Sequence, residues 1–378
     1  MKLPPLTLTG AHVLHPDGLS QEPLYLAGGL ISDQGGRRID LSGSLILPGI
    51  VDPHGDGFER HLAPRRGAAT DLGQGLRAVE AELAANGITT AMLAQFWSWE
   101  GGMRSPDFAA ALCAALEAHD ARADLRLQLR LELGCSEGFD AALTLIDRHR
   151  IGYVVFNDHL PHAQLAVGKR VPRLEGQALK SGRSPAAHLE LLTRLHDQIG
   201  AAHARLPRLC AALSARGVIL GSHDDATAKG RADWRDLGAT IAEFPVTVGA
   251  AKAACDAGDP IVMGAPNVMR GGSHSKGVSA RDLIAAGIAV ALASDYHYPA
   301  PLGAVRALLA DGWSLPEAWP LVSKVPARML GLADRGEIGP GKRADLVIVD
   351  PDLRQVQATF AGGQITYLAG PIAARFLA

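Results

Sequence analysis

Four side chains that can bind a metal ion follow an apolar run near the start of the chain. In "LILPGIVDPHGDGFERH", residues 45–61, the apolar run gives way to His54, Asp56, Glu59 and His61. His54 and Asp56 are two residues apart, and a spacing of two puts both on the same side of an extended chain. Imidazole and carboxylate together suit Zn²⁺, Mn²⁺ or Fe²⁺, so we expect both residues to reach one ion.

The same types of side chain recur where later apolar segments end. They are Glu132 in "LRLELG", Asp158 and His159 in "FNDH", His223, Asp224 and Asp225 in "GSHDD", and Asp295 in "LASDY". A single histidine at a strand end is more often structural, but the recurrence favours a metal site. A bound ion would lower the pKa of water from about 15.7 toward 7. Asp295 could then accept the proton of that water and pass it to a leaving group. Glu243, before "FPVT", receives no role.

Cationic and polar residues gather in two further segments. "HLAPRRG" carries two arginines, and "GAPNVMRGGSHSKG" combines glycines with polar and basic side chains. Backbone amides at glycines and arginine side chains can converge on a phosphate or carboxylate. Surface charge on ordinary turns is the alternative explanation, but two such segments favour an anionic substrate. The residues expected to contact the substrate are Glu59, Arg65, Arg66, Asn267, Arg270, Ser273, His274 and Lys276.

Short apolar segments alternate with Ala- and Leu-rich helical patterns from residue 46 onward, which is typical of repeated βα units. Eight such segments in about 250 residues predict a (β/α)8 TIM barrel of the α/β class. An open doubly wound sheet is the alternative, but no GxGxxG turn follows the first strand. Strand-like texture at both chain ends predicts a small β-sandwich domain of residues 1–45 and 336–378, beside a barrel of residues 46–335. The polar residues above would then lie at the carboxyl ends of the barrel strands.

The stretch between the fourth and fifth predicted strands, residues 160–216, is longer than one crossover helix requires. Its basic part, "VGKRVPRLEGQALKSGR", includes Lys169 and Arg170. A long basic segment near the mouth of a barrel is a candidate lid over an anionic substrate. A solvated charged loop is the equally weighted alternative.

The composition narrows the class of protein. Of the 378 residues 47% are hydrophobic and 20% charged, and the net charge is −2. These values indicate a globular core and give no support to nucleic-acid binding. Four dispersed cysteines without a CxxC pair favour a reducing cytoplasm, and the chain contains neither a membrane-span pattern nor a signal-peptide pattern.

Two segments resemble the amidohydrolase superfamily of metal-dependent hydrolases. They are "LILPGIVDPHGD" near the start and "GEIGPGKRADLVIVD" near the end, so the resemblance spans almost the whole chain. It implies a (β/α)8 barrel, a small β-domain built from both chain ends, and one or two divalent ions, with Zn²⁺ expected and Mn²⁺ or Fe²⁺ as alternatives. By this resemblance the metal ligands are His54, Asp56, Glu132, His223 and Asp295, with His159 as a further candidate. The catalytic residues are Asp295 and His223, and Glu132 is the expected shared ligand.

A narrower resemblance is to the diphosphatase family of the carbon–phosphorus lyase pathway, used in phosphonate metabolism. It is carried by "DPHGDGFERHLAPRRG", "FNDH", "GSHDD", "GAPNVMRGGSHS" and "SDYHYPAPL", and by Asp56 in place of the second histidine usual in the superfamily. Members hydrolyse α-D-ribose 1-methylphosphonate 5-triphosphate to the 5-phosphate and pyrophosphate. Arg66, Lys276 and Pro301 depart from the pattern, all in expected substrate loops.

The resemblance therefore implies a cytoplasmic, homodimeric, metal-dependent hydrolase that acts on a phosphorylated sugar and releases pyrophosphate. One alternative is the same site acting on a C–N bond, as an amide hydrolase or deaminase, although several cations have no use for a neutral substrate. A non-catalytic barrel subunit is a third hypothesis, against which the apparently complete ligand set argues.

Overall fold

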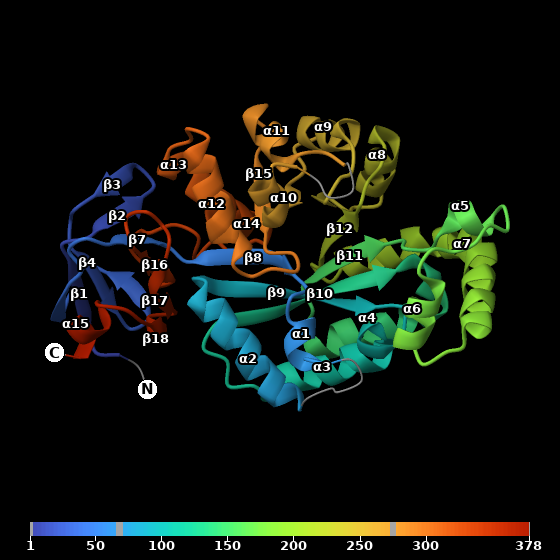
Figure 1. Ribbon diagram of the computed structural model, residues 1–378, viewed down its shortest axis with the longest axis horizontal. Coiled ribbons are helices and arrows are strands. Elements are labelled where there is room, and N and C mark those ends of the chain that lie inside the picture. Colours follow the sequence, from blue (N-terminus) through green and yellow to red (C-terminus); the bar gives the residue numbers. More distant parts are fainter. Residues whose placement is uncertain (1–2, 66–70, 273–276, 378) are drawn as a thin grey trace. The chain divides into compact units, whose positions relative to one another are not determined.

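The computed structural model describes residues 3–65, 71–272 and 277–377 (Figure 1). The chain divides into two compact units. Unit 1 comprises Met1–Leu93, His119–Arg126 and Val262–Ala378, and unit 2 comprises Ala94–Ala118 and Leu127–Ile261.

Strands from both ends of the chain form two sheets in unit 1. The first sheet has the order β5-β4-β1-β6, made of Leu30–Ser32, Leu24–Ala27, Leu6–Thr9 and Arg37–Asp40. The second has the order β18-β17-β16-β7-β2-β3, made of Gln364–Leu368, Val356–Ala361, Leu346–Val349, Leu45–Pro48, His12–His15 and Gly18–Ser20. Leu8 and Ile39 of the first sheet and Ile46 and Leu346 of the second belong to one buried core. The two sheets therefore pack as a small β-sandwich, and Figure 1 shows the early and late strands side by side.

Eight further strands form the third sheet, in which each strand lies beside the next one in the chain. They are β8 (Ile50–Gly55), β9 (Ile88–Trp97), β10 (Asp124–Glu132), β11 (Tyr153–Asn157), β12 (Ile219–His223), β13 (Ile241–Glu243), β14 (Ile261–Gly264) and β15 (Val290–Ala293). The ladders β8–β9, β10–β11, β11–β12 and β12–β13 are parallel. A parallel bridge between Gly55 and Asp295 joins the first strand to the last. The chain thus folds as a (β/α)8 TIM barrel with a small β-sandwich domain, as the sequence predicts.

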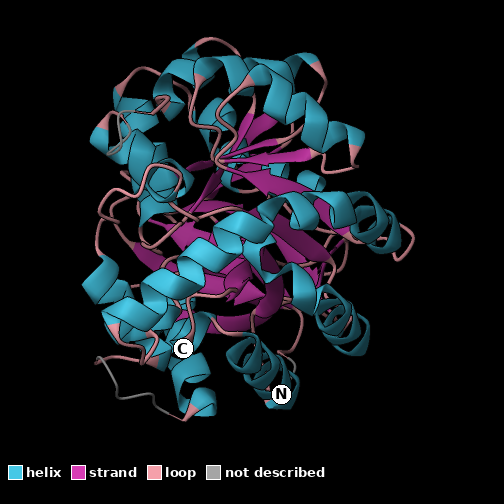
Figure 2. Cartoon of the chain, turned by 90° about the vertical axis from the view of Figure 1, so that its right-hand side faces the viewer, coloured by secondary structure: helices cyan, strands magenta, loops and turns pink. Residues whose placement is uncertain are grey.

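Helices follow the barrel strands, and Figure 2 distinguishes them from the strands by colour. The longer ones are α2 (Leu72–Ala85), α3 (Pro106–Ala118), α4 (Phe139–His149), α7 (Pro185–Ser214), α8 (Ala228–Asp236), α9 (Val248–Asp256) and α12 (Ala300–Ala310). Shorter ones are α1 (Glu59–Leu62), α5 (His162–Leu165), α6 (Leu174–Lys180), α10 (Ala265–Arg270), α11 (Ala280–Ala285), α13 (Leu315–Ala318), α14 (Lys324–Met329) and α15 (Ala373–Leu377), with 3₁₀ segments η1 (Gly102–Arg104), η2 (Leu133–Gly138) and η3 (Trp319–Val322). Asp71, Thr227 and Thr247 cap α2, α8 and α9 by accepting a backbone N–H, which stabilises each helix start.

The stretch predicted as a candidate lid contains α5, α6 and the start of α7. It packs on a buried cluster in unit 2 that includes Trp99, Leu160 and Val171. Lys169 and Arg170 are exposed, so closure over a substrate stays a prediction. No helix in the described part of the chain combines the length and the apolar character that a membrane crossing requires.

Candidate functional site

In unit 1, His54, Asp56 and Asp295 form a group whose potential ligand atoms all lie within 4.8 Å of one another. The Asp56 amide donates to the Asp295 carbonyl over 2.9 Å, and the Asp295 amide donates to the His54 carbonyl over 3.0 Å. These bonds hold the end of β8 against the end of β15. His54 is only 1% exposed. A buried imidazole and two carboxylates are a donor set that suits a divalent transition metal, so these three residues fit the predicted ion.

Asp295 has a backbone φ of +57°, in the left-handed region. Asp224, which follows β12, and Phe244, which follows β13, share this conformation, with φ of +59° and +53°. Non-glycine residues seldom adopt it, and such strain tends to gather at functional sites. The chain therefore turns sharply at three strand ends, and the sequence predicts chemistry at two of them, those of Asp224 and Asp295.

Beneath this group, the carboxylate of Asp52 accepts hydrogen bonds from the Ser294 amide over 2.8 Å and from the Ser294 hydroxyl over 2.6 Å. Both residues are fully buried. Burial raises the pKa of Asp52, although the bonds from Ser294 oppose the rise. Gly55 makes room for this contact, because a Cβ there would lie 2.7 Å from Oδ2 of Asp52 and 2.9 Å from Oγ of Ser294. The Asp52–Ser294 pair thus fixes β15 beside β8.

Two arginines hold the residue that follows Asp295. Arg60 of α1 pairs with Glu82 of α2 and donates from Nη1 to the carbonyl of Tyr296 over 2.9 Å. Arg270, at the end of α10, donates from Nη1 to the Tyr296 hydroxyl over 2.5 Å. The exposed Arg270 is therefore tied to the side chain of the residue that follows Asp295, in the same unit as the first candidate metal group.

In unit 2, Glu132 and His159 form a close ion pair, in which Nδ1 of His159 contacts Oε1 of Glu132. The His159 amide also donates to Oε2 of the same carboxylate over 3.2 Å. Burial raises the pKa of Glu132, but the bonds and charge of His159 outweigh it, and the pKa is lowered. Burial lowers the pKa of His159, but the bond and charge of Glu132 outweigh it, and the pKa is raised. With Glu100 the pair forms a second group that could hold an ion.

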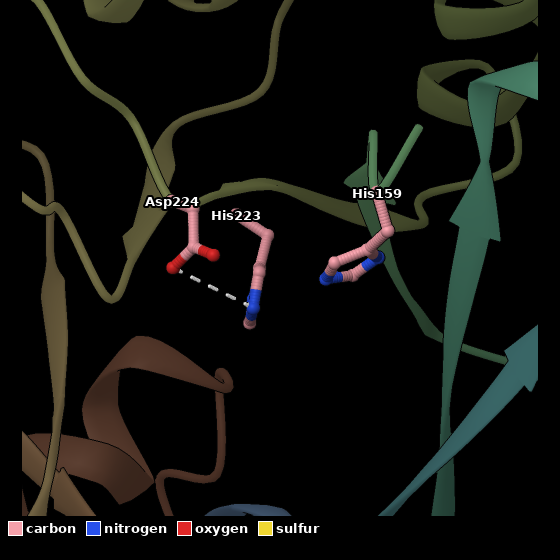
Figure 3. A group of neighbouring side chains, drawn as sticks. All are labelled: His159, His223 and Asp224. Atoms are coloured by element: carbon pink, nitrogen blue, oxygen red, sulfur yellow. Dashed lines mark ion pairs between the residues drawn. The ribbon is translucent and has the colours of Figure 1, made fainter. Parts of the chain in front are cut away.

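His223 ends β12, and both of its ring nitrogens contact charged side chains. Nδ1 lies 2.8 Å from Oε2 of Glu243, and Nε2 lies 3.0 Å from Nη2 of Arg130. Oδ1 of Asp224 is 3.7 Å from the same Nε2, and His159 lies on the other side of the imidazole (Figure 3). Burial lowers the pKa of His223, and the charge of Arg130 lowers it further. His159, His223 and Asp224 have ligand atoms within 4.8 Å of one another, yet a cation already faces the histidine.

Apart from Arg270, the predicted substrate residues fall into three groups. Those that lie outside the described residues are Arg66, Ser273, His274 and Lys276. Glu59 begins α1 and Arg65 is exposed, so both stay predictions. The side-chain amide of Asn267 donates from Nδ2 to the Val278 carbonyl and accepts at Oδ1 from the backbone N–H of Ala280, each over 3.0 Å. This amide therefore joins the ends of a loop, and contact with a substrate stays a prediction.

Sequence reasoning missed the buried partners of the predicted residues, which are Asp52, Ser294, Arg130, Asn157 and Glu243. A signal was present in β10, where Gln128, Arg130 and Glu132 alternate with leucines in "LQLRLE". A spacing of two places the three polar side chains on one face of the strand. Polar residues on the inner face of a barrel strand require partners, and this requirement could have pointed to the network.

Comparisons with known proteins identify the family and support the fold described above. The Amidohydrolase family model matches residues 68–372. The chain is 35% identical over 325 residues to the alpha-D-ribose 1-methylphosphonate 5-triphosphate diphosphatase of Escherichia coli (strain K12), covering 82% of this chain and 85% of that protein.

Solved structures share the fold at low identity. A putative prolidase from Bifidobacterium longum superposes with a TM-score of 0.65 at 15% identity, covering 100% of this chain and 99% of that one. The N-acetylglucosamine-6-phosphate deacetylase from Pasteurella multocida gives 0.64 at 13% identity, covering 96% and 99%. By the match of the family model and the identity to the diphosphatase, the chain belongs to the amidohydrolase family and is a hydrolase.

Proposed function

We propose that this hydrolase uses a divalent metal ion, Zn²⁺ by preference, to release pyrophosphate from a ribose 5-triphosphate such as α-D-ribose 1-methylphosphonate 5-triphosphate. The observation that carries the proposal is the contact of Arg270 with the hydroxyl of Tyr296, the residue that follows Asp295 in the chain. An arginine fork binds phosphate oxygens in two places at once. A cation at this position supports an anionic substrate next to the group formed by His54, Asp56 and Asp295. The identity to the diphosphatase supports the same substrate class.

The residues of unit 1 have separate roles in this reaction. His54, Asp56 and Asp295 would hold the ion, which supplies a Lewis acid that lowers the pKa of a water molecule and polarises a phosphoryl oxygen. The carboxylate of Asp295 would also take the proton of the attacking water. Arg270 stabilises charge that develops on the phosphate oxygens. Water adds to the α phosphorus, and the bond from that phosphorus to the oxygen that bridges to the β phosphate breaks. Pyrophosphate leaves with the electron pair of that bond, and the proton held by Asp295 passes to it.

Glu132 and His159 of unit 2 are retained in this proposal as predicted site residues. Glu132 and His159 offer a carboxylate and an imidazole at strand ends, and the carboxyl ends of barrel strands carry the catalytic residues in this fold. The predicted roles of Arg65, Lys276, Lys169 and Arg170 in neutralising the polyphosphate remain part of the proposal.

The test is product analysis with the metal-reconstituted protein. Incubation with α-D-ribose 1-methylphosphonate 5-triphosphate, followed by phosphorus NMR, should show one pyrophosphate per substrate. Arg270→Ala should raise KM or lower kcat, whereas Arg354→Ala, at an exposed arginine paired with Asp352, should change neither. Release of single phosphates would place the attack at another bond. Turnover of a neutral amide panel without turnover of the triphosphate would replace the proposal with a C–N hydrolase.

A further inference from the structure

A line of buried polar side chains crosses four strands of unit 2. Nε2 of Gln128 donates to Oε1 of Glu243 over 2.6 Å, and Oε2 of Glu243 lies 2.8 Å from Nδ1 of His223. Glu243 is fully buried. Arg130 can only donate, so its contact with Nε2 of His223 makes that nitrogen an acceptor and leaves the proton on Nδ1, which donates to Oε2 of Glu243. The lone pair of His223 is therefore on Nε2, since a neutral imidazole carries its proton on one nitrogen only.

Arg130 occupies the position that this lone pair faces. Its Nη2 lies 3.0 Å from Nε2 of His223, as a donor to that atom. A metal ion bound to the same nitrogen would lie about 2.0–2.1 Å away along the same direction. One lone pair cannot serve both a guanidinium N–H and an ion. The ligand role predicted for His223 thus requires Arg130 to leave.

Arg130 is held too firmly for such a movement to be easy. Its Nε and Nη2 both donate to Oδ1 of Asn157, over 3.2 and 3.0 Å. Asn157 is itself fixed, because its amide donates to the Val155 carbonyl over 2.8 Å. The guanidinium carbon lies 3.9 Å from the centre of the Phe96 ring, within the range of a cation–π contact. Arg130 is only 4% exposed, so leaving would break all of these buried contacts.

We infer that Arg130, and not a metal ion, is the resident cation of His223, so that the protein binds a single catalytic ion through His54, Asp56 and Asp295. Glu243 is then a positioning residue, which sets the tautomer that receives Arg130. The guanidinium supplies a permanent positive charge beside Glu132 and His159, where a second ion would otherwise lie. The inference rests on the proposed function only in assuming that one ion is bound.

Metal stoichiometry tests the inference. Chelator-treated protein is dialysed against Zn²⁺, and the bound metal is counted by mass spectrometry. The wild type should hold one ion per chain. His54→Asn should lose it, whereas His223→Asn should keep it with an affinity lowered by less than about a hundredfold, as expected of an outer-shell change. Two ions in the wild type, falling to one in His223→Asn, would overturn the inference.

Substitution of Arg130 provides a second test. Arg130→Gln removes the competing cation, so a second, weaker Zn²⁺ site should appear, and an unchanged stoichiometry of one would contradict the exclusion argument. Arg126→Gln is the matched control, because Arg126 lies on the same strand but pairs with Asp124 at the surface, and it should leave one site. Circular dichroism and thermal melts establish that each variant is folded.

A spectroscopic measurement covers the case in which a variant fails to fold. In ¹⁵N-histidine NMR of the wild type, Zn²⁺ should shift the ring nitrogens of His54 and leave those of His223 unchanged. A Zn²⁺-dependent shift at Nε2 of His223 would overturn the inference. Failure to release pyrophosphate with one ion bound would refute the proposed function alone, and two ions with full pyrophosphate release would refute this inference alone.

Discussion

The histidine in unit 1 and the histidine in unit 2 end barrel strands in the same way but face opposite charges. Beside His54, the ligand atoms of Asp56 and Asp295 are carboxylates within 4.8 Å. Beside His223, the atom at 3.0 Å is the guanidinium nitrogen of Arg130. Carboxylates attract a metal cation, whereas a guanidinium group, itself positively charged, repels one. Two similar sequence positions therefore differ: one belongs to a group that could hold an ion, and the other to a network that contains its own cation.

The buried residues that support the two histidines also differ between the units. Asp52 fixes the strand that precedes Asp295 through two hydrogen bonds from Ser294. Glu243 and Arg130 instead contact the two nitrogens of His223 directly. A network that satisfies its own donors and acceptors gives rigidity and a defined tautomer. A group whose carboxylates lie close together gains stability by binding a cation, because the ion offsets their mutual repulsion.

The largest expected effect separates two aspartates with the same backbone conformation. Asp295→Asn keeps a residue that tolerates the left-handed region but removes the proton acceptor, so kcat for pyrophosphate release should fall by about 10²- to 10⁴-fold. Asp224→Asn makes the same change in unit 2, where the side chain is 52% exposed, and kcat should fall by less than about tenfold. Steady-state kinetics measure both. An equal loss of kcat in the two variants would contradict the assignment of the proton transfer to Asp295 alone.

The next effect concerns stability and compares two Glu–His pairs of unit 2. Glu243→Ala leaves buried N–H groups of Gln128 and His223 without an acceptor, so the free energy of unfolding should fall by about 3 kcal/mol. Glu117→Ala removes the partner of His149 at 2.7 Å, but Glu117 is 60% exposed, and the loss should stay below about 1 kcal/mol. Urea unfolding of the chelated proteins measures the difference. Equal losses of unfolding free energy in the two variants would mean that Glu243 is exposed to water in the folded protein.

The fold and the strand-end residues could be predicted because both depend on local patterns. A (β/α)8 barrel repeats one unit, and its polar residues follow each apolar strand, as His54 and Asp295 do. The helices of the segment that begins with His162 were harder to predict from the sequence. Helices as short as α5 and α6 have weak hydrophobic periodicity, and they depend on packing against the cluster that includes Trp99 and Leu160.

The partners of the site residues could not be predicted in the same way. Gln128 contacts Glu243 across 115 positions of sequence, and Arg130 contacts His223 across 93. Nothing local in "GSHDD" states which nitrogen of His223 faces a cation. A ligand set can therefore be proposed from strand ends, whereas the charge that surrounds each histidine follows only from the packed interior.

A smaller effect comes from the Glu132–His159 pair and concerns pH. The folded pKa of Glu132 lies below its usual 4.5, so its contribution to stability is present above that value and is lost as the pH falls further. The folded pKa of His159 lies above its usual 6.5, so its contribution is present below 6.5 and is lost as the pH rises through the folded value. The metal-free wild type should exceed His159→Gln in stability most between pH 4.5 and 6.5, by at most about 1 kcal/mol because His159 is partly exposed.

Thermal melts of the chelated proteins across this range measure the difference between wild type and variant. His149→Gln, whose histidine also pairs with a glutamate, serves as the control for losing an imidazole. A wild-type advantage that grows steadily above pH 8 would contradict the raised pKa of His159.

The smallest effect concerns the arginine beside the first group. Tyr296→Phe removes the hydroxyl that accepts from Arg270 and leaves the ring in place, so the guanidinium loses one fixed contact but keeps its charge. A hydrogen bond of this kind contributes about 0.5–1.5 kcal/mol, so KM for the triphosphate should rise by less than about tenfold while kcat stays within about twofold. The double variant that combines Tyr296→Phe with Arg270→Ala should lose less than the sum of the separate changes, since both act on one contact. Fully additive changes in kcat/KM would show that Tyr296 acts on the substrate independently of Arg270, and the proposed contact between Arg270 and the phosphates would lose its support.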